Sequence, residues 1–460
     1  MVFPTLEFVL FLAVVMALNL TTDGRPGWRK GMLVAASYVF YAAWDVRLTL
    51  LLAFVSLLAW AAGLFVHLPR WRRPVMIVAI TGFLATLGWF KYANFFVLSL
   101  AQLLASLGLE RDIVWAGVIL PVGISFYTFH GISYVVDCAQ GKVAARRNPV
   151  DVAFYVSFFP HLVAGPIVRA ADFLPQIDRP TPPHAAIRAE AMVLILGGLV
   201  KKMVIANYLA VMVVDPVFAF PDQHGAAMAW AALVGYAVQI YCDFSGYSDI
   251  AIGVALLLGY RFRENFAQPY RARSLREFWR RWHISLSTFI RDYLYIPLGG
   301  RRGGVFRQGI VLMVTMTLAG LWHGAAAVFI LWGALHGAGL ALERWGRHAG
   351  LRLPGPLALP ATFAFVTALW LPFRAHDIES VRQMAAALFR QGDAGPAPAV
   401  LVLIALGLVM NLAPLRLREG TIGAVARCPR AVQALMLGAG TMAIFALSQE
   451  GTAPFIYFQF

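Results

Sequence analysis

Long apolar stretches, separated by short polar or basic segments, dominate this chain. A helix that crosses a membrane needs roughly 20 apolar residues, and fewer where it is short or re-entrant. By this criterion the pattern predicts about 10–12 membrane spans. The segment 309–342 is long enough for a tilted helix, a broken helix or two pieces. The candidate segments lie near 3–20, 31–44, 48–66, 75–90, 93–108, 114–136, 190–213, 226–258, 309–342, 357–373, 398–412 and 432–448.

Two stretches depart from the simple pattern of apolar spans. Residues 154–177 carry prolines and glycines in semi-apolar sequence, and irregular backbone at membrane depth is tolerated only where protein or a water-filled cavity surrounds it. Residues 261–302 are rich in arginine, and their central part can form an amphipathic helix that lies along an interface or dips partway into it. One side of that helix would carry Leu275, Phe278, Trp279, Trp282 and Leu286.

Composition supports an integral membrane protein. Of the 460 residues, 60% are hydrophobic and only 13% are charged, whereas soluble domains carry about 25% charged residues. The fold class we predict is an all-α polytopic membrane protein, formed by a single transmembrane domain over residues 1–460. The three cysteines do not make a disulfide framework or a zinc site, and we predict no bound metal.

The net charge of +15 also has a membrane explanation, because lysine and arginine collect on cytoplasmic loops. No RNA-binding or DNA-reading motif is visible, so nucleic acid is not an expected partner. Basic residues at 25–30 and at 70–73 follow the first and third apolar segments. These loops are therefore expected in the cytoplasm, and the N-terminus outside. The first segment has no basic start and no clear cleavage site, so we interpret it as a retained span.

The stretch LAGLWHGAAAVFILWGALHG, residues 318–337, places two histidines in apolar sequence. On one ideal helix His323 and His336 would lie roughly 20 Å apart along the axis, so each needs its own explanation. An ionisable residue inside a membrane marks a functional site by default, and imidazole can accept and return a proton near neutral pH. Gly320 and Gly324 would leave room for a substrate beside His323. The alternative for His323 is a buried ring that is hydrogen-bonded to a neighbour. His336 is better explained by a hydrogen bond across close helix packing.

Other polar groups have two interpretations each. His283, in EFWRRWHISLS, either faces lipid headgroups or lines a channel from the cytoplasmic side. The nearby arginines either seek headgroups or hold a polyanionic donor by bidentate pairing with phosphate. Asp243 lies within an apolar segment and could orient an imidazole, fix a helix bend or join helices. Tyr457, near the end of the chain, is either an interface anchor or a nucleophilic hydroxyl.

Several motifs, in this order, resemble those of the membrane-bound O-acyltransferases, of the bacterial type represented by the alginate O-acetyltransferase membrane subunit. They are PVGISFYTF, FFPHLVAGPIVR, YCDFSGYSDIAIG, EFWRRWHISLSTFIRDYLYIPLGG, LAGLWHG and a terminal YFQF. The resemblance covers nearly the whole chain, with the core motifs at about 115–345. It departs at Cys242, where relatives commonly carry an aromatic residue.

The resemblance implies tilted helices around a central tunnel, with re-entrant and interfacial helices. It implies a multi-pass enzyme of the bacterial inner membrane, with no bound cofactor and acetyl-CoA as the acyl donor. The acceptor would be an extracellular polysaccharide such as alginate, reached through periplasmic acetyltransferase-type partner proteins. His323 would be catalytic together with His283, and Tyr457 would serve as a possible acyl relay. The tunnel or donor site would include Trp322, Asp243, Ser285, Arg280, Arg281 and Arg291.

Other functions stay open on the sequence. A D-alanyltransferase fed by a carrier protein and a peptidoglycan O-acetyltransferase subunit are the nearest alternatives, and neighbouring genes would separate them. A proton-coupled transporter would use the same intramembrane histidines and aspartates, but it predicts inverted repeats, which we do not find. A scaffold of an export complex would not need His323.

Overall fold

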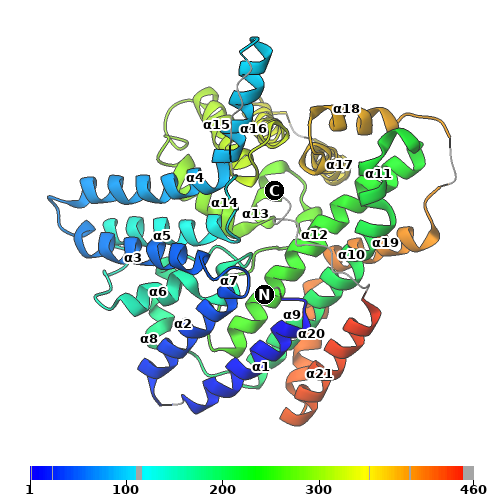
Figure 1. Cartoon of the computed structure of the whole chain (residues 1–460). Helices are drawn as coiled ribbons and strands as arrows, with labels where there is room; N and C mark the ends of the chain where they lie inside the picture. Colours follow the sequence, from blue (N-terminus) through cyan, green and yellow to red (C-terminus); the bar gives the residue numbers. More distant parts are fainter. Residues whose placement is uncertain are drawn as a thin grey trace. The chain divides into compact units, whose positions relative to one another are not determined.

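The computed structural model is helical throughout the part of the chain that it describes (Figure 1). It describes all residues except 2, 23, 110–114, 116, 352, 393–394 and 449–460. No β-strand occurs in those described ranges. The predicted all-α class of the fold is therefore confirmed.

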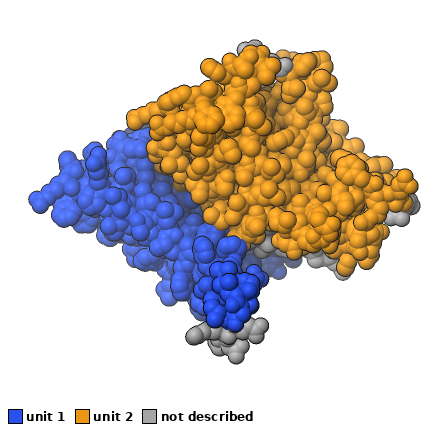
Figure 2. Space-filling model, turned by 90° about the horizontal axis from the view of Figure 1, so that it is seen from above, with its two compact units in different colours: residues 1–188, 251–263 blue, residues 189–250, 264–460 orange. Residues whose placement is uncertain are grey.

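Contacts within the chain divide it into two compact units, which Figure 2 shows in different colours. Unit 1 contains residues 1–188 and 251–263, and unit 2 contains residues 189–250 and 264–460. The single domain expected from the sequence stays a prediction. Each unit is described below by itself.

Unit 1 is built from the first eight helices. Its helices pack closely where small residues allow it: a Cβ atom at Gly63 would lie 2.5 Å from the ring of Tyr134. Lys30 and Asp151 form an ion pair of 2.6 Å that joins α2 to α6. The bounds are α1 (Leu6–Thr21), α2 (Pro26–Ala42), α3 (Leu48–Val66), α4 (Arg72–Ser106), α5 (Ile124–Ala139), α6 (Pro149–Ser157), α7 (Phe159–Leu162) and α8 (Ala170–Asp178).

The Pro- and Gly-containing stretch 154–177 is irregular, as the sequence predicts. Two short helices, α6 and α7, are followed by seven residues without helix before α8 begins. Nearly all of this stretch is buried in unit 1. The hydroxyl of Tyr155 donates a hydrogen bond of 2.9 Å to the carbonyl of Val168. Protein therefore surrounds the irregular backbone and supplies a hydrogen-bond donor to this carbonyl.

Unit 2 holds the remaining helices, and α9 and α12 have residues in both units. Between α9 and α11 the chain is partly π-helical, over Val200–Ala206 and Ala210–Val214. The bounds are α9 (Ala185–Leu199), α10 (Asn207–Leu209), α11 (Asp215–Ala219), α12 (Ala226–Leu257), α13 (Leu275–Arg281), α14 (Ile284–Ile290), α15 (Val305–His323), α16 (Ala327–His348), α17 (Gly355–Arg374), α18 (Ile378–Ala387), α19 (Pro398–Leu412), α20 (Leu415–Ala426) and α21 (Arg430–Leu447).

Six helices among the described residues are long and apolar enough to cross a membrane, and a seventh span is possible if α19 and α20, bent by 83°, count as one. This is fewer than the number of spans that the sequence predicts. The main reason is length: α1 has 16 residues, α2 has 17, and α5 has 16. These helices are shorter than the roughly 20 residues that a bilayer core requires.

The long apolar segment 309–342 forms two helices, α15 and α16, that turn back on each other. Gly320 and Gly333 make the close approach possible, because a Cβ atom at either position would lie within 2.3 Å of a carbonyl oxygen of the other helix. Small residues of this kind allow helix backbones to pack closely in membranes. The resulting α15–α16 hairpin places His323 at the end of α15, next to the turn.

Candidate active site

His323 is buried at the end of α15, with 4% of its surface exposed. Three aromatic rings pack against its imidazole. The ring centroids of Trp322, Trp332 and Phe373 lie 4.9, 5.1 and 5.2 Å from that of His323. Since these residues come from α15, α16 and α17, three helices together hold the imidazole in an apolar, aromatic environment.

His283 is the second buried histidine of unit 2 that the sequence singles out. It stands between α13 and α14 in a left-handed backbone conformation, with φ 42° and ψ 56°. The expected amphipathic helix is therefore broken into two short helices at this residue. A non-glycine residue with positive φ is uncommon, and such backbone is maintained only where surrounding contacts over-determine it.

Asn265 supplies those contacts. Its backbone carbonyl accepts the N–H of Ile284 at 2.9 Å. Its side-chain oxygen accepts the N–H of Ser285 at 3.1 Å and the hydroxyl of Ser285 at 2.8 Å. Its amide nitrogen donates to the hydroxyl of Ser248 at 3.1 Å. A backbone N–H can only donate, so these bonds identify which end of the Asn265 amide is the oxygen.

The same amide oxygen lies 3.2 Å from Nδ1 of His283. Because this oxygen can only accept, Nδ1 carries the proton when the imidazole is neutral, and Nε2 holds the lone pair. Burial lowers the pKa of His283 to about 3, which keeps the ring neutral at physiological pH. The sequence folds here to give one defined tautomer, with the basic nitrogen directed away from Asn265.

Trp322 packs near both histidines, His283 and His323. The ring of Trp322 is 6.5 Å from His283 and 4.9 Å from His323, centroid to centroid. Phe244 of α12 covers another side of His283 at 4.6 Å. The structure thus brings together His323, His283, Trp322 and Ser285, which the family resemblance groups in one site. Unit 2 contains all of them.

The segment 309–342 forms two pieces, one of the forms that the sequence left open, so the roughly 20 Å of a single helix does not apply to His323 and His336. Both pack on Trp332, at 5.1 and 4.8 Å, because the chain reverses after His323. The predicted hydrogen bond of His336 is absent, since neither ring nitrogen has a hydrogen-bond partner among the described residues. Aromatic rings enclose His336 instead, with Trp279 at 5.1 Å.

The glycines beside His323 do not leave room for a substrate, which corrects a further expectation. A Cβ atom at Gly320 would lie 2.1 Å from the carbonyl oxygen of Phe329, and one at Gly324 would lie 2.1 Å from the Phe329 ring. Both positions are filled by α16. These glycines serve the packing of the hairpin, so open space beside His323 has to come from other sides of the ring.

Asp243 forms a buried ion pair with Lys202. One helical turn and a half further along α12, Asp249 pairs with Lys201 at 2.5 Å. Each carboxylate of α12 is matched by a lysine of the π-helical segment Val200–Ala206. Of the alternatives for Asp243, the contacts favour polar joining of helices. Its chain neighbour Phe244, not its own carboxylate, is the group that packs on His283.

The three arginines proposed for donor binding differ in their contacts. Arg281 pairs with Glu277 at 2.8 Å and Arg291 pairs with Asp292 at 2.6 Å, so both are engaged within their own segment. No ion pair of Arg280 occurs among the described residues, and its side chain is exposed. The roles of these residues in binding a donor stay predictions. Tyr457 lies outside the described residues.

Sequence reasoning missed several residues that complete the site. Asn265 is one of several polar residues in the loop before α13, and no spacing rule relates it to His283 eighteen positions later. Trp332 and Phe373 are aromatic residues in apolar helices, where most aromatic residues serve packing alone. The one available signal is the density of tryptophan around the two histidines, in FWRRWHIS, LWHG and ILWGALHG.

Comparison with known proteins identifies the family of this chain. The model of the membrane-bound O-acyltransferase family matches residues 34–370, and the chain belongs to this family. The protein is therefore a multi-pass membrane enzyme, an O-acyltransferase.

Individual relatives extend the similarity. The chain is 44% identical to the probable alginate O-acetylase AlgI of Pseudomonas aeruginosa, over 85% of this chain and 75% of that protein. It is 40% identical to the protein of the same name in Pseudomonas putida, over 100% of both chains. It is also 35% identical to the peptidoglycan O-acetyltransferase of Helicobacter pylori, over 77% of this chain and 73% of that protein.

Proposed function

We propose that this enzyme takes an acetyl group from acetyl-CoA on the cytoplasmic side and passes it through the membrane for O-acetylation of an extracellular polysaccharide, alginate or a similar polymer. The enzyme would lie in the bacterial inner membrane with its N-terminus in the periplasm. Support comes from the family membership and from relatives named alginate O-acetylase. The peptidoglycan O-acetyltransferase relative makes peptidoglycan the second candidate acceptor.

The proposed chemistry begins at His323. Its imidazole removes the proton from an acceptor hydroxyl while the hydroxyl oxygen forms a bond to the carbonyl carbon of the thioester. The bond between that carbon and sulfur then breaks, and the thiolate leaves and takes up a proton. General-base assistance of this kind contributes roughly 10²–10⁴-fold to the rate. The apolar surroundings of His323 exclude water, which would otherwise compete with the acceptor hydroxyl.

His283 would assist through its fixed tautomer. With Nδ1–H directed at Asn265, the lone pair of Nε2 can accept a hydrogen bond from the acceptor hydroxyl or from an amide N–H of the donor. Trp322 lies near both imidazoles, so the two rings can contact different parts of the reacting pair. The single observation that carries the proposal is this pair of buried histidines beside Trp322.

The acceptor hydroxyl belongs either to Tyr457 or to an outside molecule. If Tyr457 is the first acceptor, its acetyl ester passes the group on to a periplasmic acetyltransferase-type partner, which acetylates the polymer. If it is not, the partner or the polymer receives the group directly. Both routes use the same donor and the same base, and they differ in whether the enzyme itself becomes acetylated.

Incubation of the purified full-length enzyme with radiolabelled acetyl-CoA tests the proposal. Wild type is compared with His323→Ala and Tyr457→Phe, each at the same level of folded protein. Label that appears in wild type and disappears in both variants supports the relay. If the label is lost only in His323→Ala, His323 remains the proposed base and the acceptor is a group other than Tyr457. Absence of label in folded wild type, together with label from an acylated carrier protein, would replace acetyl-CoA by a carrier-bound donor.

A further inference from the structure

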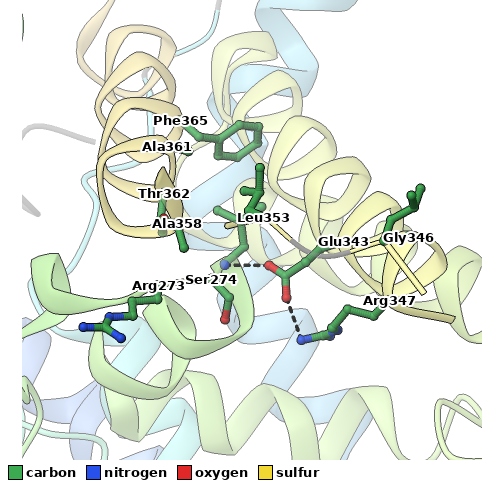
Figure 3. A pocket seen from close by; sticks show the side chains of 12 residues that line it. Arg273, Ser274, Glu343, Gly346, Arg347, Leu353, Ala358, Ala361, Thr362 and Phe365 are labelled. Carbon is green, nitrogen blue, oxygen red and sulfur yellow. Dashed lines mark hydrogen bonds and ion pairs between the residues drawn. The ribbon is translucent and has the colours of Figure 1, made fainter. Parts of the chain in front are cut away.

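A pocket of about 590 Å³ opens between α13, the end of α16 and the beginning of α17 (Figure 3). Its volume is within the range of small-molecule binding sites. Most of its wall is apolar: Leu353 and Phe365 lie on one side, and Ala358 and Ala361 of α17 lie beside them. The polar part of the wall is confined to Arg273, Ser274, Glu343, Arg347 and Thr362.

The carboxylate of Glu343 already binds groups of the protein itself. One of its oxygens accepts the N–H of Leu275 at 2.6 Å, and the other pairs with Arg347 at 2.8 Å, as Figure 3 shows. The carboxylate therefore fixes the start of α13 against α16. It supplies one negative charge, which also acts on Arg276, against several arginines nearby.

Those arginines form an arginine cluster, which we define as Arg276 and Arg280 of α13 with Arg344 and Arg347 of α16. Burial lowers the pKa of the Arg276 guanidinium, and the positive charges of Arg280, Arg347 and Arg344 lower it further. No ion pair of Arg276, Arg280 or Arg344 is present within the described ranges of the chain, and Nε of Arg344 is buried without a hydrogen bond there. The cluster thus holds four positive charges, of which only Arg347 has an ion pair, with Glu343, among the described residues.

The pocket lies where a membrane-crossing helix begins. It is lined by the first three turns of α17, which is one of the candidate spans. Leu351 and Leu353, which line it, are each more than half exposed. Exposed leucines of this kind are stable when they face lipid tails and unfavourable when they face water. The pocket therefore combines an apolar interior and opening with Arg347, the member of the arginine cluster that lines it; Arg276, Arg280 and Arg344 are not among its lining residues.

We propose that this pocket binds one anionic phospholipid, whose phosphate pairs with the arginine cluster and whose acyl chain lies against Leu353 and Phe365. Guanidinium groups bind phosphate oxygens bidentately, which suits the cluster to a phosphate ester. The basic residues also place the pocket in the cytoplasmic leaflet, where anionic lipids attract polybasic segments.

The pocket lining is separate from the candidate active site, although Arg280 of the cluster is also one of the arginines expected to bind the acyl donor. Trp332, which packs on His323, precedes Gly346 of the pocket by fourteen residues of α16, or roughly 20 Å along the helix. The indole N–H of Trp345 donates to the carbonyl of Val305 at 3.2 Å, so the pocket lies near the beginning of α15, whereas His323 is at its other end. The proposal does not rest on the acyl-transfer chemistry, and it predicts the same lipid binding in His323→Ala.

Native mass spectrometry of the purified full-length enzyme tests the proposal, with phosphatidylglycerol and phosphatidylcholine titrated into delipidated protein. We expect wild type to bind one phosphatidylglycerol more tightly than phosphatidylcholine. Arg276→Gln should weaken phosphatidylglycerol binding about tenfold, the scale of one charge-assisted hydrogen bond, and should leave phosphatidylcholine unchanged. Ala361→Trp should fill the pocket and weaken the binding of both lipids.

Matched controls use residues outside the pocket. Ala364→Trp makes the same change one turn along α17 at an exposed position, and Arg416→Gln removes the same charge from exposed α20; both should bind lipid like wild type. Equal affinity for the two lipids, or wild-type affinity in Ala361→Trp, would overturn the proposal. Displacement of phosphatidylglycerol by an equal concentration of acetyl-CoA would also overturn it, because the pocket would then belong to the acyl donor.

Discussion

Among the described residues, unit 1 contains two buried histidines and unit 2 contains three. The pair at the candidate site in unit 2 differs from the pair in unit 1 in what surrounds it. In unit 1, the rings of His130 and His161 lie 4.3 Å apart, and both are completely buried. Nε2 of His161 donates to the carbonyl of Tyr155 at 2.8 Å, and Phe158 and Phe262 pack on its ring. In unit 1, His161 therefore donates a hydrogen bond to the irregular backbone and packs against aromatic rings.

In unit 2, one member of the pair formed by His283 and His323, His283, is connected to a polar network. A side-chain amide, itself fixed by two serines, selects the tautomer of His283. Strained backbone is maintained at the same residue. The comparison teaches that burial of an imidazole is a weak indicator of chemistry. A tautomer fixed by dedicated partners, at a strained backbone position, is a stronger one, because such an arrangement costs stability.

The largest expected effect separates the two pairs directly. His323→Ala should reduce acyl transfer by roughly 10²–10⁴-fold, because the general base is removed, while the midpoint of thermal unfolding stays near that of wild type. The measurement is the rate of label transfer per folded enzyme. Retention of more than a tenth of the activity would remove His323 from the reaction.

The next effect concerns the backbone at His283. Asparagine is tolerated at positive φ, so His283→Asn should stay folded but lose the basic nitrogen and about 10²-fold in rate. His283→Val should in addition destabilise the fold by about 1–3 kcal/mol, because a β-branched residue is forced into left-handed backbone. The stabilities of the two variants are compared by thermal unfolding of the detergent-solubilised proteins. Equal stability of the two variants would contradict the strain argument.

Asn265→Ala should have an intermediate effect. It leaves the Nδ1 proton of His283 without its acceptor, so the rate constant kcat should fall roughly 10–100-fold, the kinetic equivalent of one lost hydrogen bond to a buried group. Because Asn265 acts through His283, kcat should fall more than KM rises, and the pH profile should shift. In the background of His283→Asn, the same substitution should cost little further. A full additional loss there would show that Asn265 acts independently of the histidine.

The smallest effect on activity is expected in unit 1. His161→Ala should leave transfer per folded molecule within about twofold of wild type, and should destabilise the protein by about 1–3 kcal/mol, since the Tyr155 carbonyl loses its donor. The two quantities are separated by normalising activity to the folded fraction. Loss of activity in fully folded His161→Ala protein would mean that the unit 1 pair also takes part in the reaction.

Part of this architecture could be predicted from the sequence. Residue types alone predict the helical class of the fold and the irregular stretch 154–177. They also single out His283 and His323, because hydropathy and ionisable residues in apolar segments are local properties of the sequence. The partners of those histidines could not be predicted. Asn265 reaches His283 only because the chain between them folds back, and His323 meets Phe373 only when α17 covers the hairpin. Such contacts depend on tertiary packing, which produces no periodic pattern of residues in the sequence.

The α15–α16 hairpin has a consequence for how the enzyme is made. Its two helices are adjacent in the chain and touch through backbone at Gly320 and Gly333, so the contact requires no distant segment. Local contacts form early, and domains assemble from the N-terminal end during synthesis. The hairpin can therefore close as the ribosome delivers it to the membrane, before α17 has packed against it. His323 would be set in place first, and its aromatic cover would arrive with Phe373.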